Sequence, residues 1–190
     1  WTIGVLFGAL LLASVDNQML IPILPRLELE FDISMSHLGQ LFSVYALTSC
    51  LFNLFLGPLT DRWKRIHFLR TSLGLFSILA LCTYFSQGYG QLLLLRGMTG
   101  VVTGLISTCT SSLVGDFFPY HRRARVMGIV LSGYSVALIL GVPIGTWIAT
   151  RWHWRGVFFA SSLLSSAVLV SLWGPLSNMI SATSEKSKYY

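Results

Sequence analysis

The sequence predicts an all-α membrane protein with six transmembrane helices, arranged as two inverted three-helix repeats. High hydropathy, apolar stretches as long as a bilayer is thick, and basic residues gathered on one side support this prediction. Of the 190 residues, 54% are hydrophobic and 11% charged, and mean hydropathy is +0.69, whereas soluble domains carry about 25% charged residues. A soluble protein with large buried helices is the alternative, but such helices keep a polar face that several of these stretches lack.

The apolar stretches set the number of membrane crossings. Each is about 20 residues long, the length that crosses roughly 30 Å of hydrocarbon at about 1.5 Å per residue. The predicted spans are residues 3–24, 37–59, 67–85, 91–114, 126–149 and 156–176. Together they form one transmembrane domain, residues 1–176. Residues 177–190 are predicted to be a polar cytoplasmic tail or the start of a linker.

The basic residues predict the orientation. Nine Lys and Arg residues belong to loops and span edges on one side: Arg62, Lys64, Arg65, Arg70, Arg122, Arg123, Arg125, Lys186 and Lys188. The other side has three, Arg26, Arg151 and Arg155. The positive-inside rule therefore places both termini in the cytoplasm, with the spans in the plasma membrane, which is the inner membrane in a bacterium. Because the net charge of +6 lies in these loops, no nucleic-acid partner is expected.

A weak internal repeat indicates the inverted arrangement. Gly57 precedes Arg62-Trp63, and Gly145 precedes Arg151-Trp152, each pair closing the second helix of a three-helix group. Because three crossings are an odd number, the two groups have opposite orientations, an architecture known in transporters. Coincidence is the alternative explanation for so short a similarity.

Cysteine placement and motif content argue against catalysis. Cys50, Cys82 and Cys109 lie singly in apolar stretches, so they predict neither a disulfide framework nor a metal site. The sequence contains no recognisable nucleophile motif, metal cluster or nucleotide-binding loop. We expect neither an enzyme nor a cofactor.

Two charged residues lie within predicted spans, Asp16 and Arg96. Their estimated depths differ by about one helical turn, within reach of an arginine side chain. A charge in the bilayer costs several kcal/mol unless it faces a cavity or a partner. Burial favours the neutral carboxylic acid and a nearby guanidinium favours the carboxylate, so we expect the pair to form a proton-coupling site. Snorkelling of Arg96 to the outer interface is the alternative.

Polar and aromatic residues share one side of the second span at helical spacing. They are Phe42, Tyr45, Ser49 and Asn53. This side either lines a central cavity or packs against another helix, and Tyr134 in the fifth span has the same status. The candidate cavity residues are Asn17, Tyr45, Asn53 and Tyr134.

The segment Gly57-Pro58-Leu59-Thr60-Asp61-Arg62-Trp63-Lys64-Arg65 resembles a motif of the major facilitator superfamily. In that family the loop between helices two and three reads Gly-x-Leu-x-Asp-Arg-x-Gly-Arg-Arg, and Lys64 and Ile66 depart from it here. A plain basic loop is the alternative. The resemblance implies a gating role at the cytoplasmic edge for the motif residues Gly57, Asp61, Arg62 and Arg65.

Further segments resemble the same family in order along the chain. Arg96, Gly100 and Gly104 are similar to its helix-four motif, whose arginine is implicated in proton coupling. Asp116, with Pro119 and the basic residues 122–125, resembles the loop between helices four and five. There the aspartate pairs with an arginine of the helix-two loop, here Arg65.

The fifth span resembles the helix-five motif of the drug and sugar antiporter branch, the arabinose-efflux-like carriers. The matching residues are Gly133, Gly141, Pro143 and Gly145, although the closing Gly-Gly is Gly145-Thr146 here. In that motif glycine and proline kink the helix and allow tight packing. Residues 16–25 resemble the helix-one signature, and Trp154-Arg155 with Phe158 resembles the start of helix six.

The resemblance covers nearly the whole chain and implies the N-terminal six-helix half of a transporter. It implies a small-molecule substrate, protons, and a second six-helix half or a second copy as partner within the lipid bilayer. We therefore expect proton-coupled efflux of a small organic solute by alternating access. The alternatives are a proton-coupled uptake carrier, a uniporter, or a non-transporting membrane binding or scaffold protein. The residues specify no particular substrate.

Overall fold

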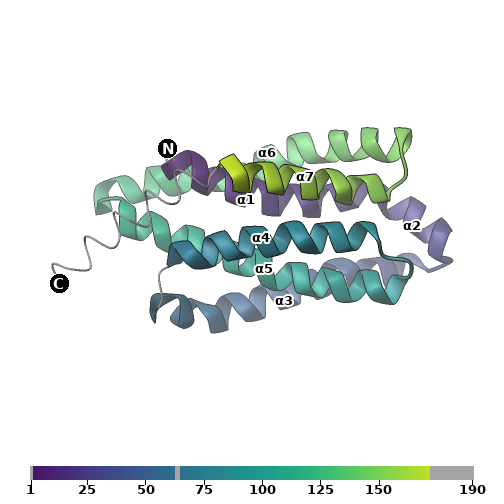
Figure 1. The fold of residues 1–190 in the computed structure, drawn as a ribbon, viewed down its shortest axis with the longest axis horizontal. Coiled ribbons are helices and arrows are strands. Elements are labelled where there is room, and N and C mark those ends of the chain that lie inside the picture. The colour runs from purple at the N-terminus through teal and green to yellow at the C-terminus, as the bar shows by residue number, and fades with distance from the viewer. Residues whose placement is uncertain (1, 63–64, 172–190) are drawn as a thin grey trace.

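The computed structural model describes residues 2–62 and 65–171, and for residues 35, 56–62 and 171 the backbone alone. The described residues form helices throughout, joined by short links, which confirms the predicted all-α fold. The elements are α1 (Thr2–Leu20), a 3-10 turn (Ile21–Ile23), α2 (Leu24–Phe31), α3 (Met35–Arg62), α4 (Arg65–Tyr84), α5 (Tyr89–Phe117), α6 (Tyr120–Arg151) and α7 (Arg155–Ser171). The long helices run side by side in an elongated bundle (Figure 1).

Five helical segments are long and apolar enough to cross a membrane. The first runs continuously from α1 through α2, Thr2–Phe31, and the others lie in α3, α4, α5 and α6. The sixth apolar helix, Arg155–Val170, is shorter within the described part of the chain. These segments match the predicted six-helix membrane architecture.

Helix pairing reveals the internal symmetry. Extensive packing joins α3 with α5, α1 with α6, and α4 with α7; α4 also packs extensively against α5, whereas α1 contacts α7 less. Two inverted repeats would exchange α1 with α5, α3 with α6, and α4 with α7. This exchange maps the α3–α5 pair onto the α1–α6 pair and the α4–α7 pair onto itself. This is the pairing expected of two inverted three-helix repeats.

Several helices continue beyond the apolar stretches. The backbone of α3 is helical to Arg62 and α6 begins at Tyr120, so residues 60–62 and 120–125 are helical where we predicted loops. A helix satisfies its own backbone hydrogen bonds whatever its side chains are, so hydropathy sets the crossing and not the helix end. The predicted end of span six and the tail, residues 172–190, lie outside the described residues.

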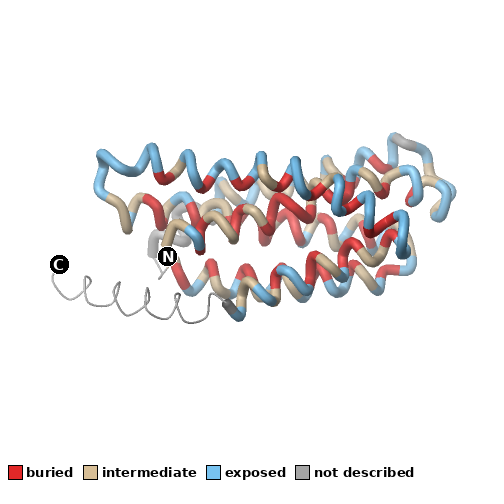
Figure 2. The backbone as a smooth tube through the Cα atoms, turned by 90° about the horizontal axis from the view of Figure 1, so that it is seen from above, coloured by how far each residue is buried: buried red, intermediate tan, exposed pale blue. Residues whose placement is uncertain are grey.

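Buried residues gather on the sides of the helices that face the middle of the bundle (Figure 2). Two buried apolar clusters form this core; one includes Leu6, Phe76 and Ile106, and the other includes Leu20 and Trp154. Helices α3 and α6 instead carry many exposed apolar side chains: Leu47, Leu51, Phe52, Leu54 and Phe55 on α3, and Leu131, Leu138, Ile139, Leu140, Ile144 and Trp147 on α6.

Candidate functional site

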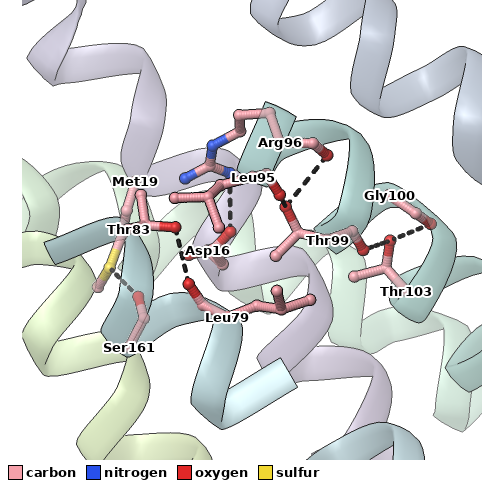
Figure 3. Close-up of polar contacts among 10 residues, drawn as sticks. All are labelled: Asp16, Met19, Leu79, Thr83, Leu95, Arg96, Thr99, Gly100, Thr103 and Ser161. Atoms are coloured by element: carbon pink, nitrogen blue, oxygen red, sulfur yellow. Dashed lines mark hydrogen bonds and ion pairs between the residues drawn. The ribbon is translucent and has the colours of Figure 1, made fainter. Parts of the chain in front are cut away.

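The structure joins the two charges that the sequence places within the membrane. Arg96 Nη1 of α5 lies 2.8 Å from Asp16 Oδ2 of α1, and each side chain is only 2% exposed (Figure 3). The Arg96 guanidinium carbon also lies 4.8 Å from the centre of the Phe158 ring. Arg96 therefore points into the bundle rather than toward the outer interface, and its charge is stabilised by a carboxylate and an aromatic face.

One polar atom of the pair is left without a partner. Arg96 Nε is buried and makes no hydrogen bond within the described part of the chain. Two further guanidinium nitrogens also carry N–H donors, so the arginine is not saturated by its one bond to Asp16. A buried ion pair is strongly stabilised only when its remaining hydrogen-bonding groups are satisfied. The Arg96 guanidinium therefore keeps hydrogen-bonding capacity beyond its bond to Asp16.

A cavity of about 180 Å³ lies beside this pair, between α1, α3, α5 and α6. All four candidate cavity residues from the sequence line it: Asn17, Tyr45, Asn53 and Tyr134. The other lining residues are Ala13, Ser14, Gln18, Ser49, Thr103 and Ser107. Asn17 follows Asp16 directly in α1, so the ion pair and the cavity wall use adjacent residues of one helix.

The sequence analysis missed the contribution of α5 to this cavity. Thr103 and Ser107 are one helical turn apart and both line the cavity, so a polar stripe at a spacing of four residues was the available signal. The stripe on α3 divides in two: Tyr45, Ser49 and Asn53 line the cavity, whereas Phe42 packs against the apolar cluster around Trp154. Asn53 is also hydrogen bonded to Thr108 of α5.

Glycines hold the cavity walls together. A Cβ atom on Gly100 would lie 2.5 Å from the Tyr45 carbonyl oxygen, and one on Gly104 would lie 2.9 Å from the Ser49 carbonyl oxygen. These glycines let α5 approach α3 more closely than any side chain allows.

The helix-five motif has the same role against α1. A Cβ atom on Gly145 would lie 3.2 Å from Met19 Cα, and corresponding atoms on Gly133 and Gly141 would lie 3.4 Å from Leu11 N and 3.3 Å from Gln18 Cβ. Pro143 lies inside α6 with its ring exposed. The glycines of the motif thus face α1, and the proline faces away from the bundle.

An ion pair at the end of the bundle joins α4 to α5. Arg65 Nη1 lies 2.7 Å from Asp116 Oδ2 and 2.8 Å from Oδ1, with the two side chains 23% and 49% exposed. This is the pairing that the family resemblance implied. The backbones of Gly57, Asp61 and Arg62 belong to the last turns of α3, and their side chains lie outside the described residues.

A second polar cluster lies at the opposite end of the bundle, where α2 meets the link between α6 and α7. Glu30 accepts a hydrogen bond from the Trp154 indole and lies 3.2 Å from Arg155 Nη2. The Trp154 and Phe158 ring centres are 6.0 Å apart, and Phe158 contacts Arg96. The sequence analysis did not find Glu30, because its partners are more than 120 residues away.

Comparisons with known proteins identify the family of the chain. The sequence profile described as Major Facilitator Superfamily matches residues 6–188. The chain is 32% identical over 147 residues to the uncharacterized MFS-type transporter YwfA of Bacillus subtilis (strain 168), covering 77% of this chain and 36% of YwfA. It is 28% identical over 174 residues to a gallate transporter of Pseudomonas putida, covering 91% of this chain and 39% of that protein.

The chain is also similar in sequence to a resistance protein and in fold to a solved transporter structure. The chain is 26% identical over 170 residues to the quinolone resistance protein NorA of Staphylococcus aureus (strain N315), covering 90% of this chain and 44% of NorA. Its fold resembles the crystal structure of a bacterial homolog to the human lysosomal transporter Spinster, in an inward-facing and unoccupied conformation. The TM-score is 0.79 and the sequence identity 18%, and the match covers 90% of this chain and 42% of that one.

The chain thus spans less than half the length of each of these relatives. The family profile, by contrast, accounts for nearly all of the chain. The helical bundle with its apolar spans, the inverted pairing of the helices and this match lead to one conclusion. The chain belongs to the Major Facilitator Superfamily and is a multi-pass membrane protein.

Proposed function

We propose that this chain is one half of a secondary transporter that exports a small organic solute in exchange for protons by alternating access. The observation that carries the proposal is the buried Asp16–Arg96 ion pair directly beside an uncharged polar cavity. The proposal involves neither a chemical reaction nor a cofactor.

The pair has the chemistry that coupling requires. A proton arriving at Asp16 removes its negative charge, and Arg96 then loses the one ionic partner that it has among the described residues. An unpaired buried cation is unstable, so the helices rearrange until Arg96 finds water or another acceptor. Because Asp16 precedes the cavity residue Asn17, the same rearrangement changes the affinity for solute.

The direction of transport has two candidates. Export is favoured by the similarity to a quinolone resistance protein and by the glycine–proline pattern of α6. Proton-coupled uptake is the second candidate, since the similarity to a gallate transporter specifies no direction. The Asp16–Arg96 pair serves either direction, because the coupling step itself is reversible.

The exposed faces of α3 and α6 fit a second half. Both helices line the cavity and both carry rows of exposed apolar side chains. In the family, substrate binds near the bilayer midplane between two six-helix units. We place a second six-helix half, from the same polypeptide or from a second copy, against these faces, with lipid around the remaining surface.

The Arg65–Asp116 pair is the cytoplasmic latch in this proposal, acting with Gly57, Asp61 and Arg62. The starts of α4 and α6, which carry Arg65, Arg122 and Arg123, lie at one end of the bundle, and α2 and the start of α7, which carry Arg26 and Arg155, lie at the other (Figure 1). This asymmetry supports cytoplasmic termini in a plasma membrane, the bacterial inner membrane.

Replacement of Asp16 tests the coupling. In proteoliposomes of the assembled transporter, Asp16→Asn is expected to abolish flux of gallate or a fluorescent quinolone driven by a pH gradient. Counterflow of the same solute without a gradient is expected to continue, because a neutral amide mimics the protonated state permanently.

Asp32→Asn is the matched control. Asp32 is exposed and has φ 49°, a conformation that asparagine tolerates well, so coupled flux should be unchanged. Undiminished gradient-driven flux in Asp16→Asn would refute the coupling role. Loss of both gradient-driven flux and counterflow would place Asp16 in solute binding instead.

A further inference from the structure

The cavity lining carries no charged side chain among the residues that the structure describes. Ala13 is the one lining residue without a hydrogen-bonding side chain. Asp16 and Arg96 do not belong to the lining; they are bound to each other and almost fully buried. An ionised group placed in this half of the cavity would therefore lose water without gaining a counter-ion, which is strongly unfavourable.

Two hydroxyl groups of the cavity lining, those of Ser14 and Thr103, donate their hydrogens within their own helices. Ser14 Oγ donates its hydrogen to the Leu10 carbonyl oxygen at 2.7 Å. Thr103 Oγ1, which the Tyr45 hydroxyl also approaches, donates to a carbonyl oxygen of its own helix at 3.0 Å. Each oxygen therefore offers lone pairs to a solute and no hydrogen.

Asn17 adds an unsatisfied acceptor to this wall. Its Oδ1 atom is buried and has no hydrogen-bond partner within the described residues. Buried polar groups in proteins are almost always paired, so a solute donor that reaches this carboxamide would satisfy it. Ser14, Asn17 and Thr103 come from two helices on neighbouring sides of the cavity, α1 and α5.

The size and aromatic content of the cavity indicate a ring. Its volume of about 180 Å³ is well above the roughly 10–15 Å³ that a single bound water needs, and leaves room for one substituted ring. Tyr45 of α3 and Tyr134 of α6 both line it. Tyrosine faces stack on aromatic rings and on the C–H faces of other flat groups.

We propose that this half of the cavity binds an uncharged ring that carries hydroxyl donors. The hydroxyls donate to Ser14 Oγ, Thr103 Oγ1 and the Asn17 carboxamide, and the ring lies against Tyr45 or Tyr134. The inference rests on the proposed transport function only in treating this cavity as the solute site. Phenolic rings and cyclic polyols share this chemistry, and both are included in the test.

Five small probes test the class with the purified full chain in lipid nanodiscs, using saturation-transfer NMR and empty nanodiscs as the blank. Resorcinol is the phenolic probe and myo-inositol the polyol. 1,3-Dimethoxybenzene is resorcinol with both donors methylated, and benzenesulfonate and benzyltrimethylammonium carry a negative and a positive charge. We expect resorcinol, myo-inositol or both to bind, and at least tenfold more tightly than the other three.

The two hydroxylated probes also distinguish a phenolic solute from a polyol. Binding of resorcinol alone indicates a phenolic solute, and binding of myo-inositol alone indicates a polyol. Equal binding of 1,3-dimethoxybenzene, tighter binding of either ion, or binding of none of the five would overturn the inference.

A pair of threonine variants tests the position of the ligand. Thr103→Val removes the acceptor oxygen and keeps the shape of the side chain. It should weaken the affinity for the hydroxylated probe by about tenfold, the usual effect of losing one hydrogen bond. Thr99→Val is the control, because Thr99 lies one turn earlier, makes the same bonds to its own helix and does not line the cavity. Equal loss in both variants would contradict the proposed contact.

The two proposals fail separately. Probe binding is measured without a pH gradient and should persist in Asp16→Asn. If no probe binds but Asp16→Asn abolishes coupled flux, the solute class is wrong and the coupling proposal stands. If probes bind as expected but Asp16→Asn transports normally, the coupling proposal is wrong and the solute class stands.

Discussion

Arg96→Met is expected to lower the free energy of unfolding by about 3–5 kcal/mol, the usual effect of leaving a buried charge without its partner. Asp16 would then lie 2% exposed with no cation beside it. Methionine preserves much of the side-chain volume and can still contact the Phe158 ring. The loss should therefore come from the charge rather than from a cavity.

The double variant Asp16→Asn/Arg96→Met separates these causes. It removes both charges, so it should recover most of the stability lost in Arg96→Met. Asp116→Asn is the control for an exposed pair, because Asp116 is half exposed beside Arg65, and it should change stability by less than about 1 kcal/mol. Reversible unfolding in mixed detergent micelles measures all three, and a double variant no more stable than Arg96→Met would contradict the buried-charge explanation.

Gly100→Ala is expected to destabilise the chain by about 1–3 kcal/mol, the range for overpacking a close contact. The new Cβ would lie 2.1 Å from Thr48 Oγ1 and 2.5 Å from the Tyr45 carbonyl oxygen. The threonine can rotate, but the carbonyl oxygen belongs to the backbone of α3. Helices α3 and α5 must therefore move apart, which widens the wall that carries Tyr45 and Thr103.

Gly115→Ala is the matched control for this substitution. Gly115 lies in the same helix, and a Cβ there would meet nothing within 4 Å. Its replacement should shift stability by no more than about 1 kcal/mol, and in the stabilising direction because alanine favours helix. The same unfolding measurement compares the two variants, and equal effects would show that close helix approach at Gly100 is not important.

The sequence predicted those parts of the fold that bilayer thickness fixes. Apolar length determines where a chain crosses the membrane, so the crossings follow from hydropathy alone. Helix ends do not, because the polar turns at Arg62 and Tyr120 are helical without being apolar. The pairing of helices was partly predictable, since Gly133, Gly141 and Gly145 indicated a close contact that the structure assigns to α1.

The candidate site was predictable where a charged residue lies in an apolar membrane span. Asp16 and Arg96 stand out because a lone charge in hydrocarbon is so unfavourable. Thr103 did not, because threonine satisfies its hydroxyl on its own helix and is common in spans. Glu30 was also missed, since no local pattern links it to Trp154. Its role depends on tertiary contact alone.

If Asp16 carries the exchanged proton, its role is tested by following protons rather than solute. Proteoliposomes of the assembled transporter, held at zero membrane potential and loaded with a pH-sensitive dye, are given a gradient of gallate or a quinolone. We expect a change in luminal pH as solute moves through the unmodified protein, and solute movement without any such change in Asp16→Asn. Proton movement per solute that is the same in both proteins would contradict that role.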